Sequence, residues 1–165
     1  MKKRKKNMMS PAGILLVLTL FLNGCSSSGN AESIVSESLS IDVSGAEEIT
    51  DADSHEGLHN DGTTYIILKF KDNRLSEQIK GNSQWHSLPM DRKTETLAYG
   101  ISDREKSIGP YLGDIELPEI QNGYYRLIDR HEENDTDILE RTSFNFTLGI
   151  YDTDTKTLYF CEIDT

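Results

Sequence analysis

Strict alternation of hydrophobic and other residues marks the second half of the chain. Between residues 63 and 71, Ile66, Leu68 and Phe70 share one face and the residues between them share the other. Side chains two positions apart lie on the same side of a β-strand, so this pattern predicts a strand. Similar but less regular patterns predict strands over residues 94–99 and 124–129.

The clearest pattern lies near the end of the chain. Phe144, Phe146, Leu148 and Ile150 alternate with polar or small residues, and residues 152–155 supply the Asp and Thr side chains that turns favour. A second apolar run follows directly, so the pair predicts a C-terminal β-hairpin. The returning strand carries Leu158, Phe160 and Ile163.

One helix is expected among these strands. Leu75 and Ile79 are four residues apart, with Asp72 and Asn73 before them as capping residues and Gly81 after them. Roughly five strands and one short helix predict a small α+β domain over residues 62–165, built on a mainly antiparallel sheet. We expect irregular connections at residues 101–118, a tight turn at 122–123 and an exposed, mobile loop at 130–141.

A different pattern opens the chain. Five basic residues at positions 2–6 precede an apolar stretch of 11 residues at positions 12–22. This is the arrangement of an export signal, and the stretch is shorter than the roughly 20 residues that cross a bilayer. We therefore expect residues 1–24 to be a cleaved signal peptide rather than a retained membrane helix.

The junction that follows, Leu22-Asn23-Gly24-Cys25, resembles the lipobox of bacterial lipoproteins. The resemblance implies cleavage between Gly24 and Cys25, a diacylglycerol on the Cys25 thiol and a new amino group open to N-acylation. Two or three acyl chains hold a protein on a membrane, so the resemblance implies a lipid-anchored protein on the extracytoplasmic face of the cell membrane. The alternative is an ordinary secretory signal in which Cys25 has no special role.

Residues 25–61 are rich in serine and acidic residues and contain few apolar ones. We expect a flexible, lipid-anchored tether. As a coil of about 36 residues it would reach roughly 30–36 Å and would lift the domain clear of the lipid head groups. Leu39, Ile41 and Val43 alternate with polar residues, which leaves open a short strand within this segment.

The charge of the chain limits its partners. The net charge is −11, and removal of residues 1–24 leaves 12 basic and 28 acidic residues, a net charge of −16. Because such a protein repels phosphates, nucleic acid is not an expected partner. Cationic peptides, basic proteins and metal ions remain possible partners. Alternatively, the acidic charge serves only to keep the protein soluble.

The sequence contains only two cysteines. If Cys25 carries lipid, Cys161 has no disulfide partner in the chain, and the domain depends on an apolar core. Cys161 lies within the run 158–163 and has no basic neighbour. We therefore expect a buried structural thiol rather than a reactive one.

The densest group of metal-ligand side chains includes Asp51, Asp53, His55 and His59. Carboxylates suit hard cations, and two histidines four apart suit a transition metal when they lie on a helix. The residues do not meet the glycine and glutamate spacing of an EF-hand, and nearby glycines disfavour a helix. We expect a solvated acidic loop, with no metal and no cofactor.

Residues 150–155 end an apolar run in Asp-x-Asp and so resemble the nucleophile motif of the haloacid-dehalogenase phosphatases. The resemblance would make Asp152 the nucleophile and Asp154 the general acid. Lys156 stands where that family has Thr or Val, and only 11 residues follow Asp154, so a hairpin turn is the preferred interpretation.

Other catalytic signatures are missing from the sequence. It has no nucleophile elbow and no phosphate-binding loop. We expect His86 and His131 to be surface or half-buried histidines. We therefore expect no catalytic residue and no enzymatic activity.

The stretch from Ile120 onward contains Asn-Gly-Tyr-Tyr, Phe-Asn-Phe-Thr and Tyr-Asp-Thr-Asp-Thr and resembles small uncharacterised lipoproteins of Gram-positive bacteria. The likeness covers residues 62–165 and implies a cell-surface setting without an activity. Several tyrosines offer either an aromatic recognition surface or ordinary sheet packing; they are Tyr99, Tyr111, Tyr124, Tyr125, Tyr151 and Tyr159.

The expected function is a non-enzymatic binding module for a protein or a cationic peptide. Two alternatives stay open. One is a self-protection lipoprotein that sequesters a toxin or an antimicrobial agent, and the other is an extracytoplasmic hydrolase.

Overall fold

The computed structural model describes residues 28–55, 61–102, 107–110, 117–131 and 136–165. The helices within these residues are α1 (Ser28–Leu39), α2 (Arg74–Lys80), α3 (Arg92–Tyr99) and the 3-10 helix η1 (Ile138–Glu140). The strands are β1 (Glu48–Asp53), β2 (Gly62–Lys69), β3 (His86–Ser87), β4 (Ile101–Ser102), β5 (Ser107–Ile108), β6 (Gly123–Asp129), β7 (Asn145–Asp152) and β8 (Thr157–Asp164).

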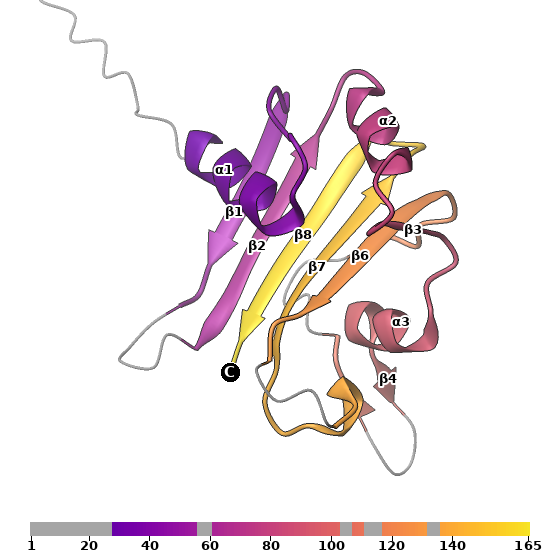
Figure 1. Ribbon diagram of the computed structural model, residues 1–165. Coiled ribbons are helices and arrows are strands. Elements are labelled where there is room, and N and C mark those ends of the chain that lie inside the picture. Colours follow the sequence, from indigo (N-terminus) through magenta and orange to yellow (C-terminus); the bar gives the residue numbers. More distant parts are fainter. Residues whose placement is uncertain (1–27, 56–60, 103–106, 111–116, 132–135) are drawn as a thin grey trace, which may run out of the picture.

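The main sheet has six strands in the order β1-β2-β8-β7-β6-β3, and each neighbouring pair is antiparallel (Figure 1). The expected C-terminal hairpin is confirmed as β7 and β8, in which Leu148 lies opposite Cys161. This hairpin occupies the centre of the sheet. The short strands β4 and β5 pair separately. The chain therefore has the expected α+β fold, with three α-helices among the described residues where the sequence predicts one.

Hydrophobic residues cover both faces of the sheet. On one face, α1 and α2 pack on β2, β7 and β8 to form the α1–α2 core, which includes Val35, Ile79 and Phe160. On the other face, α3 and η1 pack on β6, β7 and β8 to form the α3 core, which includes Leu97 and Leu148. β7 is buried on both sides from its second residue onward, as is usual for a central strand between two layers.

The segment expected to be a flexible tether is structured over residues 28–55, so the prediction is wrong for these residues. Ala31, Val35 and Leu39 lie four residues apart in α1 and are at most 3% exposed. Ile41 and Val43 are also buried, and β1 pairs with β2 along its whole length. Ile34 also packs against this core. The apolar stripe of α1 is narrow and its solvent face is rich in serine, so the composition of the segment does not reveal the helix.

The strand expected at residues 94–99 is also wrong, because these residues belong to α3. Thr94, Thr96 and Ala98 alternate with larger residues, which imitates a strand period. Asp91 decides the outcome: its side chain accepts a hydrogen bond from the Thr94 backbone N–H and starts a helix. Leu97 and Ala98 are then buried in the α3 core.

The remaining local predictions have mixed outcomes. The helix expected at Leu75 and Ile79 is confirmed as α2, which ends at Gly81. The loop expected at 130–141 is described only in part, and there Ile138 is 1% exposed and anchors η1 in the α3 core. The tight turn expected at 122–123 is not formed, because Gly123 begins β6 and lies opposite Asp152 in the sheet. A Cβ at Gly123 would lie 2.0 Å from the Tyr151 carbonyl oxygen, so only glycine fits this approach.

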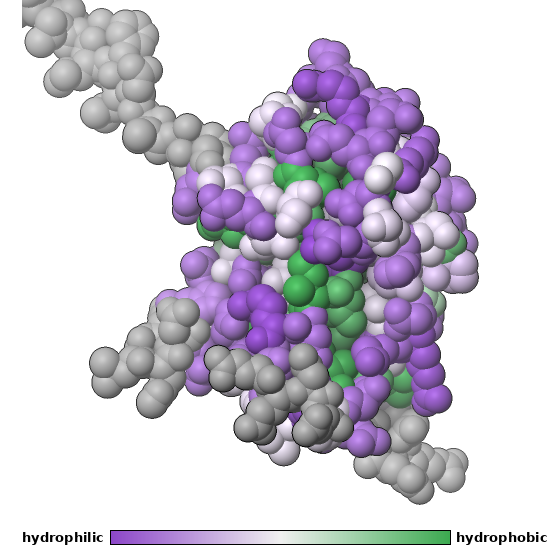
Figure 2. All heavy atoms as spheres, in the orientation of Figure 1, coloured by the Kyte–Doolittle hydropathy of each residue, from purple (hydrophilic) through white to green (hydrophobic). Residues whose placement is uncertain are grey.

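The surface of the described residues is mostly hydrophilic, with a narrow hydrophobic band across the face shown in Figure 2. In the described part of the chain, no helix is long and apolar enough to cross a membrane. Two large apolar residues stand out as exposed, Tyr99 at 36% and Ile101 at 38%. Tyr99 ends α3 and Ile101 begins β4, so the two exposed apolar residues lie together at the C-terminal end of α3. This end of the helix is therefore a candidate site.

Candidate functional site

The N-terminus of α3 is fixed by Asp91. Its carboxylate accepts hydrogen bonds from the Thr94 backbone N–H (2.9 Å), the Thr94 hydroxyl (3.1 Å) and the Tyr125 hydroxyl (3.1 Å). Burial acts to raise the pKa of Asp91, but the hydrogen bonds from Thr94 and Tyr125 outweigh it and lower the pKa. The carboxylate therefore stays ionised and holds α3 in one position against β6.

The C-terminus of α3 presents Tyr99. The Tyr99 hydroxyl donates a hydrogen bond to the Pro118 carbonyl oxygen at 3.1 Å, which ties α3 to the segment that leads into β6. Gly100 follows with a φ of 75°, and a Cβ there would lie 2.7 Å from the Pro110 nitrogen. The glycine permits this close crossing of two backbones, after which Ile101 is directed outward at the start of β4.

Two adjoining hollows open on either side of Tyr99, with volumes of about 360 and 520 Å³. Glu95, Tyr99 and Glu119 line both of them. Apolar residues complete the walls. We call the combined region the Tyr99 surface and define it by Leu88, Met90, Glu95, Tyr99, Ile101 and Glu119.

The two glutamates of this surface act electrostatically on its tyrosine. Burial raises the pKa of Tyr99 most strongly, and the negative charges of Glu119 and Glu95 raise it further. Both carboxylates are thus close enough to place a negative potential at the ring. An aromatic face, apolar walls and nearby carboxylates form a suitable environment for a cation on an apolar stem.

The positive residues of α3 lie on the other side of Ile101. A hollow of about 410 Å³ is lined there by Arg92, Lys93 and Ile101, among others. Lys93 pairs with Asp137 across it at 3.3 Å. Asp137 and Glu140 also line this hollow, so its basic and acidic residues balance. Among the described residues that line the hollows of the Tyr99 surface, the charged ones are Glu95 and Glu119.

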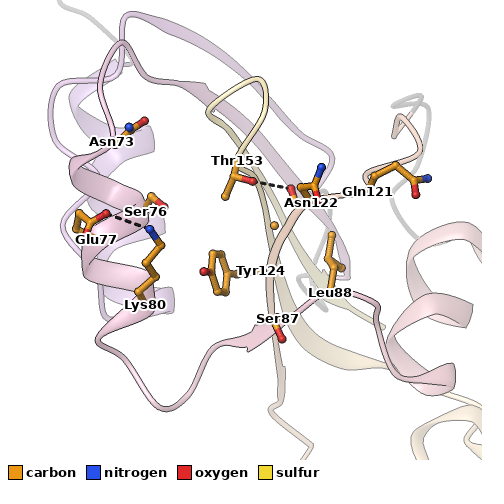
Figure 3. Close-up of a pocket in the computed structure, with 11 residues that line it drawn as sticks. Asn73, Ser76, Glu77, Lys80, Ser87, Leu88, Gln121, Asn122, Tyr124 and Thr153 are labelled. Carbon is orange, nitrogen blue, oxygen red and sulfur yellow. Dashed lines mark hydrogen bonds and ion pairs between the residues drawn. The ribbon is translucent and has the colours of Figure 1, made fainter.

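A separate, polar hollow lies between α2 and the start of β6 (Figure 3). Side chains from α2, β3, β6 and the β7–β8 turn surround a volume of about 470 Å³. Lys80 and Glu77 pair with each other on its α2 wall at 3.1 Å. We call it the α2 pocket; it borders the Tyr99 surface at Leu88 and Gln121.

The candidate metal ligands are only partly brought together. Asp51 and Asp53 lie on β1 rather than in a loop, and His59 falls outside the described residues. The His55 Nδ1 atom lies 2.5 Å from the Asp53 carboxylate, and its Nε2 atom lies 3.4 Å from Asp164. Among the described residues, no three His, Cys, Asp or Glu side chains are grouped closely enough to hold a metal ion.

The Asp-x-Asp motif closes the β7–β8 hairpin. The Asp152 carboxylate accepts hydrogen bonds from the backbone N–H groups of Asp154 and Thr155 and from the Thr155 hydroxyl, at 2.7 to 3.3 Å. Asp154 in turn accepts a hydrogen bond from the Asn122 side chain at 2.9 Å. The expected turn is confirmed, and both carboxylates have structural partners.

The cysteine and the two histidines considered in the sequence analysis, Cys161, His86 and His131, differ in their burial. Cys161 is fully buried as expected, and burial together with the charge of Glu162 raises the pKa of its thiol to about 12. His86 is exposed, with its ring 5.5 Å from that of Tyr125, and His131 is partly exposed. Gly24 and Cys25 lie outside the described residues.

The tyrosines do not gather on one exposed sheet face. Tyr125 and Tyr151 are buried, Tyr124 and Tyr159 are half-buried, and Tyr111 lies outside the described residues. Only Tyr99 is both described and exposed, and it comes from a helix. Glu95 and Glu119, which complete its surface, have no local sequence signal because they meet only in the fold. Comparison of the chain with protein-family models, with curated proteins and with solved structures gives no match.

Proposed function

We propose that the protein is a lipid-anchored, extracytoplasmic binding module that takes up a cationic, amphipathic peptide or protein segment without catalysis. The single observation that carries the proposal is the Tyr99 surface. There, exposed Tyr99 and Ile101 lie beside Glu95 and Glu119, which line the same hollows. Apolar side chains of a ligand would cover the exposed apolar residues, and its basic groups would meet the glutamates.

The charge of the exported part supports this assignment of the partner. A net charge of −16 after removal of residues 1–24 attracts basic ligands from a distance and speeds their encounter. Short-range recognition then depends on apolar contact, because exposed ion pairs contribute only roughly 0.2–1 kcal/mol each. The Tyr99 surface offers both contributions in one place.

The anchor and the fold together favour a ligand found at the membrane. Cys25 would carry the lipid, and α1 begins at Ser28, only three residues later. Three extended residues span at most about 10 Å, so the folded part would sit next to the lipid instead of at the end of a long tether. Cationic amphipathic peptides collect at such surfaces.

Binding can be measured with the full chain in detergent and a fluorescent amphipathic peptide of Lys and Leu, together with its counterpart in which Glu replaces Lys. We expect the basic peptide alone to bind, and to bind less tightly at high ionic strength. The double variant Glu95→Gln/Glu119→Gln should weaken binding about two- to tenfold. Glu37→Gln/Asp51→Asn removes the same charge elsewhere and should change binding much less.

Particular outcomes of these measurements would contradict the proposal. Equal binding of the basic and acidic peptides would refute the charge argument. An equal loss in the two double variants would show that net charge acts without a defined site. Mass spectrometry of membrane-extracted protein tests the anchor separately, since cleavage before Cys25 with added acyl mass is expected and an unprocessed, unmodified chain would disprove it.

A further inference from the structure

The α2 pocket contains hydrogen-bonding groups that are not paired with any of the described residues (Figure 3). Asn73 caps α2 without a side-chain hydrogen bond. In the described part of the chain, no hydrogen-bond partner is found for the side chains of Asn73, Ser76, Ser87 and Tyr124. They come from the N-cap of α2, from α2 itself, from β3 and from β6, and all four line the same hollow. A ligand in the pocket would therefore find one amide and three hydroxyl groups ready to bond.

The charged residues that line the pocket neutralise each other. Lys80 is the basic residue of its lining and Glu77 the acidic one, and they pair with each other at 3.1 Å. The Asn122 side chain is held by Asp154 at 2.9 Å, outside the lining. An anionic ligand would meet no unpaired cation, and a cationic ligand would have to break the pair. The pocket thus differs in chemistry from the Tyr99 surface.

The walls of the pocket are fixed before any ligand arrives. The Leu88 backbone N–H donates to the Gly123 carbonyl oxygen at 3.0 Å, which joins β3 to β6. The Thr153 backbone N–H and hydroxyl both donate to the Asn122 carbonyl oxygen at 3.0 Å, which joins the β7–β8 turn to the same wall. A preformed cavity of about 470 Å³ lies within the roughly 300–1,000 Å³ of small-molecule sites.

We propose that the α2 pocket binds a neutral, polyhydroxylated ligand, namely a saccharide unit. Each sugar hydroxyl both donates and accepts a hydrogen bond, and so matches a lining of hydroxyls and amides that also do both. The half-buried Tyr124 ring and the side chain of Leu88 supply apolar contact for the C–H groups of a sugar ring. The unit comes either from a glycan polymer or from a free sugar.

The test is a calorimetric and ligand-observed NMR titration of the full chain in a non-glycosidic detergent. The probes are the tetramer of N-acetylglucosamine, which is neutral, the tetramer of glucosamine, which is cationic, and a tetramer of galacturonic acid, which is anionic. The N-acetylglucosamine monomer distinguishes the two sources of the ligand. We expect the neutral probes alone to bind in the pocket, with the tetramer tighter than the monomer if the source is a polymer.

Variants locate the binding. Tyr124→Phe removes one hydroxyl and should weaken the neutral tetramer about fivefold, as expected for one hydrogen bond. Asn73→Ala, on the α2 wall, should have a similar effect. Tyr159→Phe is the matched control because Tyr159 packs against the α3 core, on the other face of the sheet, and it should leave the affinity unchanged.

Several results would overturn the proposal. The proposal is wrong if neither neutral probe binds, or if the protein binds a charged tetramer more tightly than the neutral one. It is also wrong if Tyr124→Phe, Asn73→Ala and the unchanged protein bind the neutral tetramer with equal affinity. If Tyr124→Phe alters the circular dichroism spectrum, Ser87→Ala at an exposed position replaces it with the same expectation. Loss of peptide binding in Glu95→Gln/Glu119→Gln bears only on the Tyr99 surface, so the two sites fail independently.

Discussion

The Arg126 guanidinium donates a hydrogen bond to the backbone carbonyl oxygen of Leu39, 87 residues earlier in the chain. Leu39 is the last residue of α1, so a positive charge sits where the helix leaves its carbonyl groups without partners. Arg126 is 8% exposed, and burial lowers its pKa. This contact attaches the N-terminal helix to β6.

We expect Arg126→Ala to lower the free energy of unfolding by about 2–3 kcal/mol, because it leaves a buried carbonyl without its donor and opens a cavity. Urea denaturation followed by circular dichroism measures the loss. Arg74→Ala is the control, since the Arg74 pair with Asp72 is exposed and its loss should cost at most about 1 kcal/mol. Equal losses in the two variants would contradict the capping role.

Gly149 and Leu39 should show a compensating pair of mutations. A Cβ at Gly149 would lie 2.7 Å from the Leu39 side chain and 3.0 Å from Trp85. Gly149→Ala should therefore destabilise by about 1–3 kcal/mol through overpacking, and Leu39→Ala by roughly 2–5 kcal/mol through a cavity.

The double variant tests whether the two positions share one space. It should be less destabilised than the sum of the single variants, by about 1 kcal/mol, because the new methyl group enters the space that Leu39 leaves. A double-mutant cycle in urea gives this value. Strict additivity would show that α1 does not pack closely on β7.

His55 should make stability depend on pH near neutrality. The hydrogen bond with Asp53 raises the pKa of His55 most strongly, and Asp164 raises it further. Because the folded pKa is the higher one, the stabilisation is fully present below the unfolded pKa of about 6.5 and is lost as the pH rises through the folded pKa. Unfolding midpoints measured between weakly acidic and weakly basic pH should fall across this window.

The matched variants identify the histidine responsible. His55→Gln should remove this part of the pH dependence, whereas His86→Gln, at an exposed position, should retain it. A slope that survives in His55→Gln would assign the effect to another group. A rise in stability with pH over the same window would reverse the sign and disprove the ion-pair account.

Asp152→Ala should destabilise the protein by releasing the β7–β8 turn. Asp152 is 6% exposed and holds three donors of the β7–β8 turn, so we expect a loss of about 1–3 kcal/mol. Asp154→Ala breaks one exposed contact with Asn122 and should cost less. Thermal unfolding measures both, and a larger loss for Asp154→Ala would contradict the assignment.

The extent to which the sequence predicts this fold depends on how local each signal is. The β7–β8 hairpin and α2 were predictable because their periods, caps and turn residues are contiguous. α1 is not predicted because its few apolar residues lie among serines and glutamates, whose composition resembles that of a tether. α3 was misassigned because a single capping carboxylate, Asp91, outweighs an ambiguous alternation.

The candidate sites were less predictable than the fold. Glu95 and Tyr99 are close in α3, but Glu119 joins them only through the return of the chain at Pro118. The α2 pocket likewise combines residues between Asn73 and Thr153 that the sheet order alone brings together. Contacts between distant segments leave no pattern in a single sequence.

The position of β8 between β2 and β7 has a consequence for the order of synthesis. During synthesis, β2 and β7 are both made before β8, the strand that lies between them in the sheet, has been translated. Any fragment that stops before residue 157 has a sheet in two disconnected halves. The six-stranded sheet can therefore be completed only after β8 has been made.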